Sequence, residues 1–288
     1  MKRFVLPIFL IGTIALFFFS KRGTQIKNMS LGYVLPTNYV SEEGMTVSTR
    51  ILVPEGYQRK KYSEGTFPHY IQNYALKEFA AEVINYDGNP YGYQGGHVGV
   101  FDLSVPSHGL MQCADALIRL RAEYLWEQHR KGEIGFEFTS GHYCSWNEYA
   151  RGLRPKINGN KVTFQKEAPP DDSKTNFYRY LDLVYMYAGT LSLHHELPNV
   201  PTLNDLEVGD MLIYPGSPGH VIMIVDKVVN AQGENLFIFA QGNTPSQSVH
   251  VLKNLNDRKL NPWYQLEMGA PLEIPTYRFS EVKFVRFK

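Results

Sequence analysis

The sequence contains two cysteines and nine histidines, the residue types that most often supply a nucleophile and its base. Cys113 lies in the segment Gly109-Leu-Met-Gln-Cys-Ala-Asp115, near the start of an apolar helical pattern. A helix N-terminus or a nearby imidazolium lowers the pKa of a thiol and makes it nucleophilic. Cys113 is therefore a candidate nucleophile. The alternative is that Ser107 caps the helix, in which case Cys113 lies in the second turn and belongs to the core.

His220 is the candidate base. The stretch 209–214 has the pattern of a strand, Pro215-Gly-Ser-Pro-Gly219 forms a tight loop, and His220 then occupies the first position of another strand. A titratable imidazole at the mouth of a strand is well placed to face a cleft. The alternative is a histidine that anchors the loop through its backbone.

A carboxamide follows on the next predicted strand, which runs into Gln241-Gly-Asn243. If the two strands pair, Gln241 or Asn243 returns beside His220. A carboxamide there can accept a hydrogen bond from a ring N–H and so fix the imidazole tautomer. The order Cys113, His220, Gln241 is then nucleophile, base and orienter, although Gln241 could equally be a sheet-edge amide.

The remaining cysteine and histidines have simpler interpretations. Cys144 precedes a helix capped by Ser145, and we interpret it as a structural residue, with two alternatives left open: a rival nucleophile, or a disulfide with Cys113 in an oxidising compartment. The adjacent pair His194-His195 lacks metal-ligand spacing. We interpret His142 and His250 as surface residues. No cofactor or metal is predicted.

Periodicity predicts helices first and a sheet afterwards. Apolar residues recur at helical spacing over 110–124 and 177–188, whereas the pattern over 46–53 and 97–103 predicts strands. Beyond residue 205 the pattern changes to short strands at 211–214, 220–225, 236–240 and 248–252. This order is typical of an α+β fold with helices packed on an antiparallel sheet.

Composition and the N-terminus limit the function and the compartment. Hydrophobic residues make up 43% and the net charge is +1, so a globular domain is expected and a main role on nucleic acid is not. Lys2 and Arg3 precede an apolar run over residues 4–19, an order characteristic of export. We expect residues 1–30 to be a signal peptide or an N-terminal membrane anchor, with 21–35 a polar linker, and locate the protein in the periplasm or cell envelope.

Two family resemblances follow from these motifs. The Gly-Asp, strand, Gly-Pro loop, Gly-His, strand pattern at 209–226 resembles the second half of NlpC/P60 and CHAP cysteine hydrolases, and CHAP-type members have Glu-x-Asn where this chain has Gln241-Gly-Asn243. Over most of residues 35–288 the chain is similar to an exported bacterial family, domain of unknown function 4846. The segments that carry this similarity are Gln112-Cys-Ala-Asp-Ala, Arg119-Leu-Arg-Ala-Glu-Tyr124, Ser217-Pro-Gly-His220 and Val249-His-Val-Leu252.

The hydrolase resemblance implies a papain-like domain over 35–288, with an insertion around 140–200. It also implies an exported enzyme that cleaves an amide or peptide bond in cell-wall peptidoglycan, with a muropeptide as substrate. Cys113 would attack, His220 would carry the proton and Gln241 would orient the ring. Gln112 and Asn243 are the candidate substrate or oxyanion residues. The alternative is a non-catalytic envelope-associated binding protein in which Tyr86, Tyr91 and Tyr93 stack on sugars or peptides.

Overall fold

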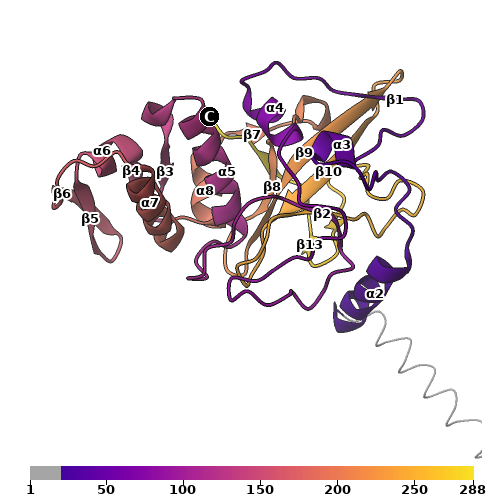
Figure 1. Cartoon of the computed structure of the whole chain (residues 1–288), viewed down its shortest axis with the longest axis horizontal. Helices are drawn as coiled ribbons and strands as arrows, with labels where there is room; N and C mark the ends of the chain where they lie inside the picture. The colour runs from indigo at the N-terminus through magenta and orange to yellow at the C-terminus, as the bar shows by residue number, and fades with distance from the viewer. Residues whose placement is uncertain (1–20) are drawn as a thin grey trace, which may run out of the picture.

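An eight-stranded antiparallel sheet forms the centre of the structure, a computed structural model that describes residues 21–288 (Figure 1). The strand order is β2-β11-β10-β9-β8-β14-β7, and β1 pairs with the distal part of β9. Its strands are β1 (Tyr57–Arg59), β2 (His97–Val100), β7 (Asn199–Val200), β8 (Met211–Tyr214), β9 (His220–Asn230), β10 (Asn235–Gln241), β11 (His250–Leu252) and β14 (Phe284–Val285).

Helices and three two-stranded sheets surround this centre. The helices are α2 (Lys21–Val34), α3 (Val47–Arg50), α4 (Phe67–Gln72), α5 (Cys113–Glu127), α6 (Trp146–Ala150), α7 (Lys174–Tyr187) and α8 (Thr190–Glu196), with 3-10 turns at Lys131–Glu133 and Leu203–Asp205. The small sheets pair β3 (Gly135–Glu137) with β4 (Tyr143–Ser145), β5 (Leu153–Asn158) with β6 (Lys161–Lys166), and β12 (Leu272–Glu273) with β13 (Arg278–Phe279).

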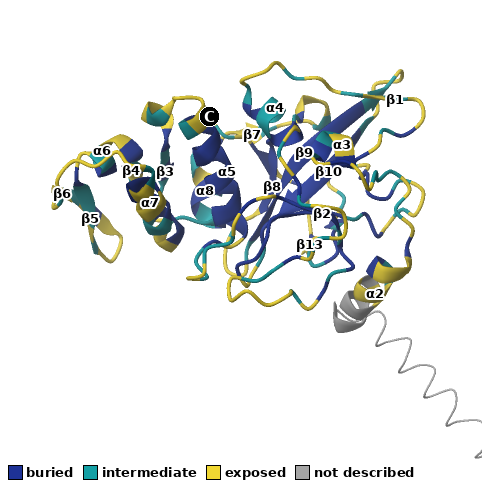
Figure 2. Ribbon diagram, in the orientation of Figure 1, coloured by how far each residue is buried: buried dark blue, intermediate teal, exposed yellow. Residues whose placement is uncertain are grey.

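Helix α5 packs against β9 and β10 and is buried along almost its whole length (Figure 2). Its apolar residues Leu117, Ile118 and Leu120 are inaccessible to solvent, which explains why so long a helix lies at the centre of the molecule. Its polar residues Arg119 and Glu123 are also buried and bond to each other at 2.9 Å. Arg119 also donates to the Ser104 carbonyl oxygen at 2.7 Å, which ties α5 to the segment that precedes it.

The second predicted helix belongs to a lobe beside the sheet. β3, β4, β5, β6, α6 and α7 lie together on the left of Figure 1, on the far side of α5 from the sheet. Ser173 caps α7 by accepting a hydrogen bond from the backbone of Asn176. Trp146 packs edge-on against Phe177, which fills the core of this lobe.

The α+β class, the helices at 110–124 and 177–188 and the four strands beyond residue 205 are confirmed. Two local predictions are wrong. Residues 47–50 form helix α3, not a strand, because the Thr46 hydroxyl accepts from Thr49 N and caps a turn.

The predicted linker at 21–35 contains helix α2 instead. Gly32 lies so close to the backbone of Gly95 that any side chain there would clash, and the Tyr33 hydroxyl accepts from Gln94 N. Such tertiary contacts can override weak helix propensity. The apolar run at 4–19 lies outside the described residues. Within the described part of the chain, no helix is both long and apolar enough to cross a membrane.

Candidate active site

Cys113 is the first residue of helix α5. Gln112 is the N-cap, so the helix does not start at Ser107 and Cys113 does not lie in a second turn. The side chain is only 8% exposed, and burial raises the pKa of its thiol to about 11. Hydrogen bonds from the backbone N–H groups of Ala114, Val221 and Cys113 itself act against burial and lower the pKa of the thiol. The sulfur therefore faces the backbone of β9 directly after His220.

Asp115 is the acidic residue whose charge acts on this thiol. One carboxylate oxygen accepts the backbone N–H of Gln112 at 2.9 Å, as expected of an acid in the first turn of a helix. The other oxygen is buried without a hydrogen-bond partner. Burial raises the pKa of Asp115 to about 7, and its charge in turn raises the pKa of Cys113.

His220 and Gln241 meet across the pairing of β9 with β10. Ala240 pairs with Met223, so Gln241 falls diagonally across from His220 on the same face of the sheet. The ring Nε2 of His220 lies 2.7 Å from Oε1 of Gln241, and both side chains are buried. The two strands do pair, which was the condition for bringing Gln241 or Asn243 beside His220, and Gln241 is the one bonded to it. Burial lowers the pKa of His220 to about 4, while the bond to Gln241 raises it.

The β12–β13 hairpin covers the imidazole. The ring of Tyr277 lies 4.8 Å from that of His220, centroid to centroid, and the ring of Phe279 lies 5.9 Å away. Burial, Tyr214 and the thiolate charge of Cys113 all raise the pKa of Tyr277. Tyr277 therefore lies beside the imidazole and within electrostatic range of the thiol. Sequence reasoning missed this contact because Tyr277 is 57 residues from His220 along the chain.

His250 is buried, not exposed as the sequence interpretation held. It is 4% exposed and pairs directly with Gln241 across β10 and β11. The amide Nε2 of Gln241 lies 3.1 Å from Nε2 of His250 and 3.1 Å from Oγ1 of Thr276. Burial lowers the pKa of His250 to about 4. The surface interpretation is wrong because β11 is an inner strand of the sheet, between β2 and β10.

The two other predicted site residues differ in position. Gln112 is exposed at the helix start, where its side-chain oxygen accepts from the Thr244 hydroxyl at 3.0 Å. Its amide N–H groups are thus left to donate. Asn243 accepts from the backbone of Thr244 and is not brought to His220. Between them, Gly242 lies so close to α5 that a Cβ would be 2.8 Å from Ala116 and 3.6 Å from Cα of Cys113.

Cys144 is remote from this arrangement. It lies on β4 in the lobe beside α5, buried, and burial raises the pKa of its thiol to about 12. Both cysteines are free, so the disulfide alternative is wrong. Ser145 caps α6 as predicted, accepting from Glu148 N at 3.2 Å.

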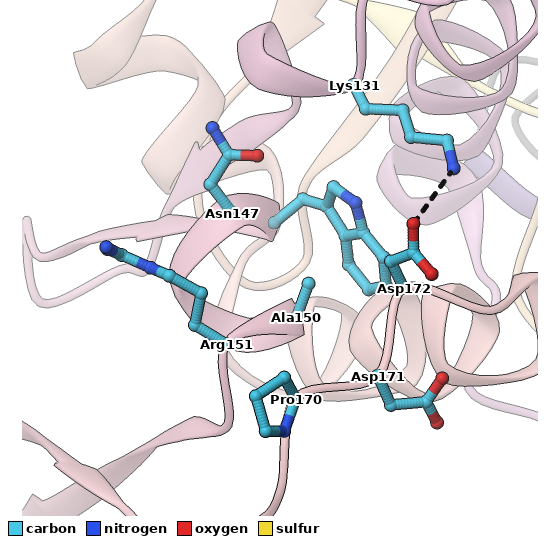
Figure 3. A pocket seen from close by; sticks show the side chains of 8 residues that line it. Lys131, Asn147, Ala150, Arg151, Pro170, Asp171 and Asp172 are labelled. Carbon is cyan, nitrogen blue, oxygen red and sulfur yellow. Dashed lines mark ion pairs between the residues drawn. The ribbon is translucent and has the colours of Figure 1, made fainter.

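A cavity of about 700 Å³ lies in the same lobe and shares no residue with the site formed by Cys113, His220 and Gln241. Figure 3 shows Lys131 directed toward Asp172, with which it forms a long ion pair of 3.9 Å, while Arg151 points the other way. Among the described residues, no cluster of three or more histidine, cysteine or acidic side chains could hold a metal ion.

Comparison with known proteins gives a single family. No curated protein and no solved structure matches the chain. The family described as domain of unknown function 4846 matches residues 47–286, which include α5, the whole central sheet and every residue of the site. The chain therefore belongs to the domain of unknown function 4846 family.

Proposed function

We propose that this protein is an exported cysteine hydrolase that cleaves an amide or peptide bond, with Cys113 as nucleophile, His220 as base and Gln241 as orienter. The observation that carries the proposal is the 2.7 Å bond between His220 and Gln241, next to a helix whose first residue is Cys113. The N–H of Val221 on the sulfur supports the same arrangement.

The reaction starts from a neutral pair. Burial raises the pKa of Cys113 and lowers that of His220, so at neutral pH the thiol keeps its proton and the imidazole is uncharged. As the sulfur attacks the carbonyl carbon, its proton passes to His220, and the partial positive charge of the helix N-terminus stabilises the developing anion. His220 then returns the proton to the leaving amine, and water hydrolyses the thioester with His220 as base.

The oxyanion needs donors at the helix start. The backbone N–H of Cys113, which bonds its own sulfur when no substrate is bound, and the amide of Gln112 are the groups we assign, because helix N-terminal N–H groups have no backbone partner within the helix. We assign no role to Asn243, because its side-chain oxygen accepts from Thr244 N within its own loop.

The fold and substrate are part of the same proposal. We propose a papain-like domain of the NlpC/P60 or CHAP kind over 35–288, in which the region around 140–200 is an insertion. The order of a nucleophile at a helix start, a base at a strand start and an amide on the neighbouring strand supports this. The export pattern at residues 1–30 supports a cell-envelope location and a peptidoglycan peptide as substrate.

A second candidate is a non-catalytic envelope-associated binding protein on the same fold. The observation that favours it is the burial of Cys113, which is only 8% exposed and has a raised pKa, as a core cysteine would. Of the three tyrosines considered for ligand stacking, Tyr86 is exposed and lies against Gly109, whereas Tyr93 is buried.

Incubation with purified muropeptides, followed by mass spectrometry of the products, tests the proposal. We expect new amine and carboxyl termini with the native protein, no products with Cys113→Ala, and full activity with the matched control Cys144→Ala. Cleavage that survives Cys113→Ala would refute the assignment of the nucleophile. Binding of the muropeptide without cleavage, unchanged by Cys113→Ala, would favour the second candidate.

A further inference from the structure

Three hydrogen bonds connect a backbone carbonyl to the candidate base through two buried side chains. The Ser248 carbonyl oxygen lies 2.9 Å from Nδ1 of His250. Nε2 of His250 lies 3.1 Å from Nε2 of Gln241, and Oε1 of Gln241 lies 2.7 Å from Nε2 of His220. None of the four residues is more than 4% exposed, so water does not compete for these bonds.

The Ser248 carbonyl oxygen fixes the direction of all three hydrogen bonds. A carbonyl oxygen only accepts, so Nδ1 of His250 carries a hydrogen and, in the neutral ring, Nε2 is an acceptor. Its partner must then be the NH₂ group of Gln241, which only donates. The amide oxygen is thereby directed at His220, whose Nε2 must donate. The Nδ1 lone pair of His220 is left free to take a proton.

His250 is the member of this chain that selects the amide orientation. The other partner of the Gln241 NH₂ group is the Thr276 hydroxyl, at 3.1 Å, and a hydroxyl can donate as well as accept. Thr276 would tolerate either orientation. With the amide reversed, its oxygen would face the lone pair of His250 and its NH₂ would demand a lone pair from Nε2 of His220.

We propose that His250 is a positioning residue that locks the Gln241 amide and, through it, holds His220 in the tautomer with the proton on Nε2. The catalytic meaning of this lock rests on the proposed function, since only a nucleophile beside His220 needs the free Nδ1. The lock itself is a property of the four residues and can be measured without any substrate.

The direct test is ¹⁵N NMR of the full chain labelled in its histidine rings, read through the two-bond ring couplings that identify the protonated nitrogen. At neutral pH we expect His250 protonated on Nδ1 and His220 protonated on Nε2, each neutral, with signals assigned from His250→Phe and His220→Asn. A native protein with His220 protonated on Nδ1, or His250 protonated on Nε2, overturns the proposal. In this test the variants serve only to assign the signals.

The variant His250→Phe then tests which residue holds the lock. Loss of the acceptor should reduce the ratio of the Nε2–H to the Nδ1–H tautomer of His220 by roughly tenfold, the factor that one hydrogen bond is worth. The matched control is His97→Phe, a neighbouring half-buried imidazole with its ring centroid 6.0 Å from that of His250 and its Nε2 bonded to Gln94 instead of Gln241. An unchanged His220 tautomer in His250→Phe, or the same change in His97→Phe, overturns the assignment.

Activity separates this proposal from the proposed function. If both hold, His250→Phe lowers kcat on a muropeptide in proportion to the lost Nε2–H tautomer and leaves KM unchanged. If the native tautomers are as expected but Cys113→Ala keeps full activity, the lock stands and the assignment of the nucleophile fails. A shift of tautomer in His250→Phe with undiminished kcat overturns the positioning role.

Discussion

The buried imidazole of His250 gives the protein an acid sensitivity that one substitution should remove. The pKa of His250 is lowered by burial to about 4, against about 6.5 in an unfolded chain. Below pH 6.5 the unfolded chain takes up a proton at this residue that the folded protein does not. Stability contributed by the neutral ring is therefore complete above pH 6.5 and is lost as pH falls toward 4.

The size of the effect follows from the two pKa values. One proton corresponds to about 1.4 kcal/mol per pH unit, so the free energy of unfolding loses about 3 kcal/mol at this residue between pH 6.5 and 4. His250→Phe abolishes this loss but leaves the NH₂ of Gln241 short of one acceptor, which costs about 2 kcal/mol at every pH. The variant should be the less stable protein at pH 8, and the two stabilities should meet near pH 5.

Urea unfolding followed by circular dichroism at half-unit intervals from pH 4.5 to 8 measures both curves. Asp115 also has a shifted pKa, but His250 is not among its causes, so it contributes equally to both proteins and cancels in the difference. His97 would not cancel, because the charge of His250 lowers its pKa, so both curves are recorded in a His97→Phe background. Parallel curves, with a difference in unfolding free energy that does not change with pH, would refute the reasoning. They would mean that His250 titrates in the folded protein as it does in the unfolded chain.

Two further substitutions test the contact between helix and sheet. Gly242→Ala places a Cβ 2.8 Å from Ala116. We therefore expect about 1–3 kcal/mol of destabilisation in urea unfolding and a loss of any hydrolysis. The control Gly92→Ala adds a Cβ in open space and should change neither the stability nor the hydrolysis. Asp115→Asn removes the charge that raises the pKa of Cys113, so alkylation of the thiol by iodoacetamide should show a lower apparent pKa, and an unchanged pH profile would exclude the influence of the carboxylate.

The sheet could be predicted from the sequence to a large extent. Strands β8 to β11 are short apolar segments separated by Gly, Pro and Asn, and their period sets both the face and the end at which each side chain lies. This is why Gln241 or Asn243 could be expected beside His220 once the two strands were assumed to pair. The start of helix α5 was less certain, because Gln112 is an unusual N-cap and Ser107 a favourable one.

The surroundings of the pair could not be predicted in the same way. Tyr277 and Thr276 reach the site through a hairpin whose two-residue strands carry almost no periodic signal. His250 was predictable only in part, since Val249 and Val251 flank it within a strand that the pattern did predict, but the position of that strand inside the sheet, between β2 and β10, has no signal in the sequence. Helix α3 was missed because its cap, the Thr46 hydroxyl, competes with the strand preference of Val47 and Thr49.

The central claim is that Cys113 is a nucleophile served by His220, and covalent trapping tests it most directly. The folded protein is incubated at neutral pH with a short peptidyl chloromethyl ketone, and intact mass and peptide mapping follow the adduct over time. We predict one adduct per chain, on Cys113, with a rate that saturates with reagent and falls sharply in His220→Asn. An adduct that forms only under unfolding conditions, on Cys113 and Cys144 at similar rates, would contradict the claim and identify Cys113 as a residue of the core.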